Sequence, residues 1–146
     1  MNPASGRIGT ASATGAEARP EVVPLSAGFR LGRGGWYVLE EAAGAVFRWV
    51  RNDAEILVTD AGARSLELEL EPGPGMRFAP FVLRVRNERG AELLSMQIAS
   101  RRRLEIALPR DARVPYALTL HAEGGGVTVA GFTRVLNFRV FHIPPA

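Results

Sequence analysis

The feature that most constrains this chain is a strict alternation of apolar and charged residues. Residues 65–71 read SLELELE, which places three leucines on one side of an extended chain and three glutamates on the other. Side chains of a β-strand point alternately to opposite faces, so this stretch predicts a strand with one buried and one wet face. No segment of the chain shows a sustained helical period of 3.6 residues. We therefore expect an all-β protein.

Similar two-residue periods recur along the chain, separated by turn-forming residues. We expect further strands at residues 36–40, 45–50, 54–59, 80–87, 92–98, 102–108, 116–121 and 136–143. Glycine, proline, asparagine and aspartate gather between them, for example at 60–62, 72–75, 87–90, 109–111 and 124–126. About eight or nine short strands at this spacing predict an antiparallel β-sandwich, with jelly-roll connections as the expected topology.

The first part of the chain has a different composition. Residues 1–28 are rich in alanine, serine, glycine, threonine and proline and show no period, which is typical of a disordered leader or linker. We expect the β-sandwich domain to occupy residues 29–146. No apolar run approaches the ~20 residues that span a bilayer, and no secretory apolar stretch follows Arg7. These observations predict a cytoplasmic domain without a membrane span.

The residue types present and the net charge exclude several function classes. There is no cysteine, which rules out disulfides and thiolate catalysis. The net charge is only +3, and the arginines at 101–103 have no aromatic residues between them, so we expect no nucleic-acid partner. The two histidines, His121 and His142, fall on different expected strands, and no third ligand completes a metal site. We expect no metal, no cofactor and no catalytic activity.

Aromatic and charged residues form one candidate binding cluster early in the chain. Trp36, Tyr37 and Glu40 are followed closely by Arg48 and Trp49. Aromatic faces can stack on sugar rings while charged groups bond the hydroxyls, so the cluster could bind carbohydrate. The alternative is that the tryptophans belong to the core and that Glu40 pairs with Arg48 across a hairpin.

A second candidate pair lies near the C-terminus, where Asn137 and Arg139 alternate with apolar residues. These side chains could bind a hydroxyl, carboxylate or phosphate group. The alternative is a final strand of the sheet with Arg139 paired to an acid. For the glutamates at 67–71, we expect a solvated face paired with Arg84 and Arg86, since a calcium site draws its ligands from more varied directions.

Several short motifs together resemble a known kind of domain. They are Gly-Trp-Tyr-x-x-Glu at 35–40, Phe-Arg-Trp at 47–49, the alternating leucine strand at 66–70, Leu-Pro at 108–109 and Arg-x-Leu-x-Phe-Arg-Val at 134–140. Their order resembles β-sandwich accessory domains, similar to carbohydrate-binding modules, of bacterial glycosyltransferases and surface-polysaccharide proteins. The resemblance covers about residues 35–143. It implies a non-catalytic jelly-roll module that contacts carbohydrate or a glycan-biosynthesis protein.

Two alternatives to this function remain open. Residues 138–143 place apolar side chains on both faces of one strand, which is typical of a central strand or of an interface. The chain could therefore be an assembly protein that oligomerises or docks a partner through a sheet face. A hydrolase or lyase on a jelly-roll scaffold is the third possibility, because a fold alone does not determine function.

Overall fold

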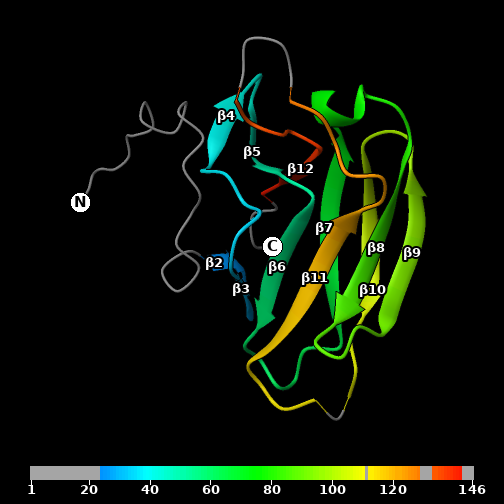
Figure 1. The fold of residues 1–146 in the computed structure, drawn as a ribbon. Helices are drawn as coiled ribbons and strands as arrows, with labels where there is room; N and C mark the ends of the chain where they lie inside the picture. The colour runs from blue at the N-terminus through cyan, green and yellow to red at the C-terminus, as the bar shows by residue number, and fades with distance from the viewer. Residues whose placement is uncertain (1–23, 111, 129–132, 143–146) are drawn as a thin grey trace.

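The computed structural model describes residues 24–110, 112–128 and 133–142, which form two packed antiparallel sheets (Figure 1). The five-stranded sheet contains, in spatial order, β10 (Arg102–Ala107), β7 (Ser65–Pro72), β12 (Phe138–Phe141), β5 (Ala45–Val50) and β4 (Glu40–Ala42). The six-stranded sheet contains β2 (Pro24–Ser26), β3 (Phe29–Leu31), β6 (Asp53–Val58), β11 (Tyr116–Ala122), β8 (Phe81–Asn87) and β9 (Glu92–Ile98). One short 3-10 helix, η3 (Pro74–Met76), follows β7.

The strand order is that of a jelly roll. The order β5-β12-β7-β10 in one sheet faces β6-β11-β8-β9 in the other, so most successive strands switch sheets. The predicted all-β sandwich is therefore confirmed. The described residues form eleven strands rather than eight or nine, because β2, β3 and β4 are three-residue strands too short to show a period.

The alternation of apolar and charged residues in the sequence matches the alternation of buried and outward-facing side chains in the structure. In β7 the leucines are buried between the sheets, while the glutamates lie on the outer face. In the other sheet, Leu118 and Leu120 of β11 are both fully buried. Removing these apolar side chains from water is the main source of stability for such a sandwich. Two of the aromatic rings in the core, Phe81 and Phe138, stack with their centres 5.3 Å apart.

The prediction of a strand at residues 36–40 is wrong. Trp36 forms only an isolated bridge to Val50, and β4 begins at Glu40. The preceding glycines explain the difference, because Gly35 has a φ of +88° and a side chain there would meet the Asp53 carbonyl at 1.8 Å. This segment carries the chain from β3 in one sheet to β4 in the other, so it cannot stay in one hydrogen-bonded ladder.

The boundary of the predicted leader also differs from the structure. Residues 1–23 lie outside the described part of the chain, but Pro24–Ser26 already form β2. This strand pairs with β3 through a tight turn in which Gly28 has a φ of +86°. Among the residues described, no helix has the length and apolar character that crossing a membrane requires.

Candidate functional site

Trp36 and Tyr37, the first residues of the predicted sugar-binding cluster, are buried. Their exposed fractions are 1% and 4%. The Trp36 indole N–H donates to the Glu55 carbonyl at 2.8 Å, and the Tyr37 hydroxyl accepts the Val135 N–H at 3.2 Å. A sugar needs an open ring face for stacking, and neither ring offers one. The stacking platform expected at these two residues is therefore wrong in this structure, and both rings have the core role considered as its alternative.

Glu40 and Arg48, the charged members of that cluster, do not pair with each other. Glu40 instead accepts a hydrogen bond from Arg134 at 3.0 Å, and the Arg134 guanidinium lies 5.3 Å from the Tyr37 ring centre. Arg48 donates to the Tyr37 carbonyl at 3.1 Å. The two motifs at 35–40 and 134–140 thus meet in space, and their polar groups bind one another.

Trp49 and Arg139 lie opposite each other on the outer face of the five-stranded sheet. Arg139 forms an ion pair with Glu71 of β7, with Nε to Oε1 at 2.7 Å. Its guanidinium carbon lies 4.4 Å from the ring centre of Phe47, 5.0 Å from Phe141 and 5.3 Å from Trp49. We call these five residues the arginine–aromatic layer. Glu71 already occupies the position that a ligand carboxylate would take, so the layer is internally satisfied.

Asn137, the other member of the predicted C-terminal pair, contacts loop residues rather than Arg139. It is fully buried, and its amide N–H donates to Asn52 Oδ1 at 2.6 Å. Gly126 packs so closely that a side chain there would meet Asn137 Oδ1 at 1.6 Å. Within the described chain, Asn137 Oδ1 has no hydrogen-bond partner. The side chain therefore holds loops together, and it does not combine with Arg139 into a single site.

The prediction that the glutamates at 67–71 pair with Arg84 and Arg86 is also wrong. Glu69 pairs with Arg101 at 2.6 Å and with Arg103 at 3.3 Å. Burial alone would raise the pKa of Glu69, but the hydrogen bonds and charges of these two arginines outweigh it and lower the pKa. Arg84 and Arg86 could not serve, because they lie on β8 in the opposite sheet.

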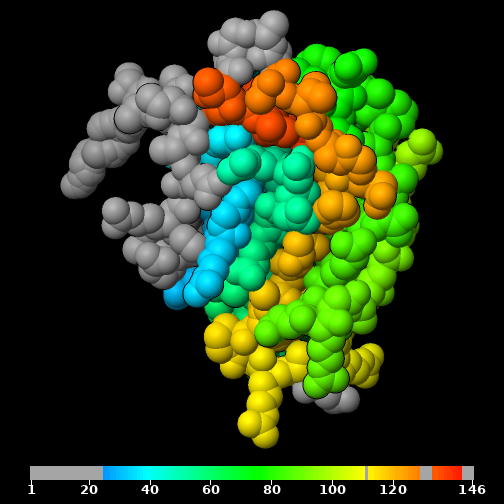
Figure 2. Space-filling model, viewed as in Figure 1, coloured from blue at the N-terminus to red at the C-terminus, as the bar shows by residue number. Residues whose placement is uncertain are grey.

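The jelly-roll connections place another group of arginines at one end of the sandwich. The connections β6–β7, β8–β9 and β10–β11 all lie at the lower end in Figure 1. Two of them border an open groove of about 790 Å³. We call it the loop-end groove, and its walls are Asn87, Glu88, Arg89, Pro109, Arg110, Ala112, Arg113 and Tyr116. The β10–β11 connection, yellow in Figure 2, projects from this end.

The loop-end groove carries an excess of positive charge. Among the described residues that line it, three are arginines and one is a glutamate. Glu88 accepts the Ala117 N–H at 2.9 Å, which ties the β8–β9 turn to the start of β11. Among the described residues, no acid forms an ion pair with Arg89, Arg110 or Arg113. Unlike Arg139, these guanidinium groups have their donors available to a ligand.

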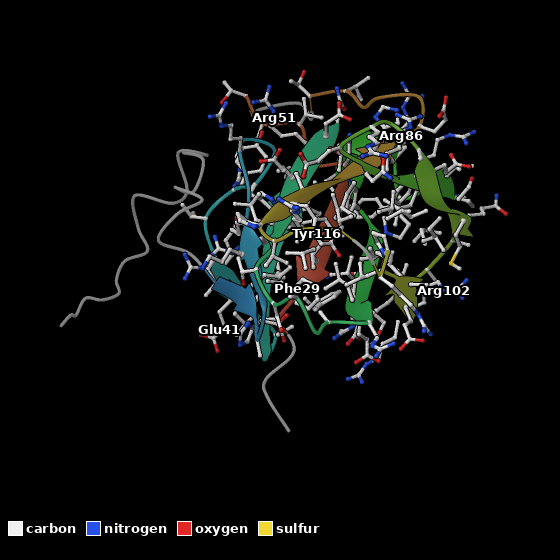
Figure 3. All side chains as sticks on the ribbon, turned by 90° about the horizontal axis from the view of Figure 1, so that it is seen from below. Phe29, Glu41, Arg51, Arg86, Arg102 and Tyr116 are labelled. Atoms are coloured by element: carbon white, nitrogen blue, oxygen red, sulfur yellow. The ribbon has the colours of Figure 1, made fainter. Side chains whose placement is uncertain are left out.

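Tyr116 forms the floor of the groove. Seen from this end in Figure 3, Tyr116 lies near the middle of the molecule. It is only 8% exposed, and burial raises the pKa of its hydroxyl. The hydroxyl is therefore neutral at physiological pH and can serve as a hydrogen-bond donor.

These groove residues were missed by reasoning along the chain. The sequence identifies 87–90 and 109–111 only as turns. Strand order offered a usable signal. Successive strands of an antiparallel jelly roll run in opposite directions, so every second connection lies at the same end of the sandwich. Counting the strands in this way places the β8–β9 connection, with Arg89, at the same end as the β10–β11 connection, with Arg110.

Catalytic and metal chemistry has little support in the described residues. Among them, no group of three histidine, aspartate or glutamate side chains could hold a metal ion. His121 Nδ1 contacts Asp53 Oδ1 at 2.7 Å, but the carboxylate is largely solvated on the outer face of the six-stranded sheet.

Compared with known proteins, the chain matches no family model, no curated protein and no solved structure.

Proposed function

We propose that this jelly roll is a non-catalytic accessory module that binds an anionic carbohydrate in the loop-end groove. The observation that carries the proposal is the set of three arginines without acidic partners in the described chain. The assignment to glycan or cell-envelope polysaccharide biosynthesis agrees with the resemblance seen in residues 35–40 and 134–140. Loops held by a rigid sandwich are a common place for such binding.

The chemistry of the groove suits a sugar acid. A guanidinium binds a carboxylate through two parallel N–H bonds, and its remaining N–H groups can bond sugar hydroxyls. The Tyr116 hydroxyl adds a neutral donor, and Pro109 and Ala112 add small apolar surfaces. The volume of about 790 Å³ lies within the usual range for ligand sites and can hold a short oligosaccharide.

A glycan fits the groove better than a nucleic acid does. Single-stranded nucleic acids bind by stacking their bases on aromatic faces. Tyr116 is the aromatic side chain in the wall of this groove, and it is nearly buried. The net charge of +3 is also small for a polyphosphate ligand.

The observation behind the assembly alternative has another explanation in the structure. Strand β12 lies between β5 and β7, so both of its edges are paired. Its outward Phe141 is covered by the Arg101 guanidinium, 3.6 Å above the ring. Ile143 lies outside the described residues. The apolar character of both faces of β12 is therefore accounted for by its central position.

The test is calorimetric titration with an oligogalacturonate, a polymer of uronic acids. We expect saturable binding that is lost when the same chain length of neutral galactan replaces it. The variant Arg110→Ala/Arg113→Ala should weaken the affinity about a hundredfold, because each charge-assisted contact contributes about 1.5 kcal/mol.

The matched control is Arg30→Ala/Arg102→Ala. It also lowers the net charge from +3 to +1 (3 − 2), but at exposed residues outside the groove. It should retain the affinity within about twofold. Equal losses in the two double variants, or tighter binding of a single-stranded oligonucleotide than of the uronate, would contradict the proposal.

A further inference from the structure

A second, smaller hollow is lined by residues of both sheets. Its volume is about 240 Å³. Its walls come from β2, the 32–39 segment, β5 and the end of β12, and they consist of Leu25, Trp36, Leu39, Arg48, Val140, Phe141 and His142. None of these residues lines the loop-end groove, so the two sites are independent.

The walls of this hollow are mainly apolar. The indole N–H of Trp36 is already bonded to the Glu55 carbonyl, so Trp36 offers only carbon atoms to the hollow. Val140 belongs to the main core, while Leu39 is 46% exposed and stands at the rim. A ligand that enters past Leu39 would therefore contact a largely apolar surface.

One charged group lies in this apolar setting. Arg48 Nη1 donates to the Tyr37 carbonyl, which uses one of the five N–H donors of the guanidinium. No ion pair joins Arg48 to an acid in the part of the chain that the structure describes. Burial lowers the pKa of Arg48 to about 10, so the group is still charged at neutral pH. A half-buried cation without an anion is unfavourable until an anion is supplied.

We propose that this hollow binds a small organic monocarboxylate, with its carboxylate on Arg48 and its apolar body against Trp36 and Leu39. A carboxylate matches the two parallel N–H groups of a guanidinium. An apolar cavity of about 150 Å³ holds benzene, so the larger hollow has room for a benzoate or a carboxylate of similar size. Sugars fit poorly here, because the walls offer few partners for several hydroxyl groups.

The experiment uses 4-iodobenzoate as the probe and Trp36 as the reporter. Trp49→Phe leaves Trp36 as the single tryptophan, and the iodine quenches the fluorescence of an indole that it touches. We expect saturable quenching of Trp36 in the full chain. The neutral analogue 4-iodobenzyl alcohol should bind at least about tenfold more weakly, because it cannot form the charge-assisted pair.

Three variants in the Trp49→Phe background separate binding from folding. Arg48→Met keeps the aliphatic stem and should weaken 4-iodobenzoate at least about tenfold. Leu39→Asp changes an exposed rim residue and should also weaken the probe, because the new carboxylate competes for Arg48. Arg30→Met removes the same charge from an exposed position on β3 and should leave the affinity unchanged.

The outcomes decide the proposal in either direction. Circular dichroism first establishes that each variant is folded, and Leu39→Asp serves as the test if Arg48→Met is not. The proposal is overturned if quenching does not saturate, if the alcohol quenches as well as the carboxylate, or if the folded Arg48 or Leu39 variant binds with unchanged affinity. Uronate binding in the loop-end groove is measured separately, so either site can fail alone.

Discussion

The arginine–aromatic layer and the loop-end groove use the same cation in opposite ways. In the layer, Arg139 contacts three aromatic rings and an acid of its own chain, Glu71. In the groove, Arg89, Arg110 and Arg113 surround an open volume and have no acidic partner among the described residues. The layer is a completed set of contacts, whereas the groove is an incomplete one.

This difference indicates which region of the molecule has groups free to bind a ligand. A cluster of aromatic and charged residues in the sequence marks dense packing as readily as it marks a ligand site. What distinguishes the two is whether each charged group already has its partner. The same criterion applies to Arg48, whose neighbour across the strand pair is the apolar Val140.

Among the changes that compare the two regions, the largest effect is expected from adding an acid to the groove, as Glu71 provides one for the layer. Ala112→Asp should place a carboxylate among the groove arginines and reduce the affinity for oligogalacturonate by about 2 kcal/mol, or roughly thirtyfold. Calorimetric titration measures this change. Ala112→Asn has nearly the same size without the charge and should bind within about twofold of the unchanged protein. A similar loss in both variants would mean that shape, rather than charge, governs the groove.

The converse change removes the acid from the layer. Glu71→Gln leaves Arg139 half-buried without an anion and should lower the free energy of unfolding by about 1–2 kcal/mol, between the values for exposed and buried pairs. Urea denaturation measures this. Glu67→Gln, on the same face of β7 but in an exposed position, should change stability by less than about 0.5 kcal/mol. Uronate affinity should stay the same in both variants, and equal destabilisation would contradict the role given to the layer.

Salt should separate the two regions further. Raising the ionic strength from about 0.05 M to about 0.2 M should weaken uronate binding by about 1 kcal/mol, because the exposed groove charges are screened. The destabilisation caused by Glu71→Gln should change by less than half of that, since Arg139 is covered by rings. Titration and denaturation at the two salt concentrations give both numbers. A salt-independent uronate affinity would show that the groove arginines do not carry the binding.

The smallest expected effect concerns acid stability on the paired face. Because the pKa of Glu69 is lowered in the folded state, its contribution is present above the pKa of an unfolded glutamate and disappears as the pH falls through the lowered value. Solvent screening limits that contribution to about 0.5 kcal/mol. Glu69→Gln should therefore be less stable than the unchanged protein at neutral pH and equally stable in acid. Denaturation at both pH values tests this, and a pH-independent difference would contradict it.

Local sequence patterns predicted the fold well but the site poorly. The strands at 45–50 and 92–98 agree with the structure to the residue. In β7, burial on one face of the strand produces the two-residue period that the sequence shows at 65–71. Pairing between distant residues leaves no such period. Glu71 lies 68 positions from Arg139, and no local pattern shows that they meet.

The same limit applies to burial and to the groove. Trp36 is a candidate stacking residue in the sequence because Tyr37, Glu40, Arg48 and Trp49 follow it closely. In the structure the chain crosses between the sheets there, and the ring is buried. The groove arginines are dispersed over two turns. Only the topology of the jelly roll brings them to one end, and counting the strands along the chain could have predicted this.

The most direct test of the account is a chemical-shift map of the ¹⁵N-labelled protein titrated with oligogalacturonate. If the groove arginines bind the uronate, the largest shifts fall on residues 87–89 and 109–116, around the loop-end groove, while Trp49, Glu71 and Arg139 remain unaffected. Shifts concentrated on the arginine–aromatic layer, or none at saturating uronate, would contradict binding by the groove arginines.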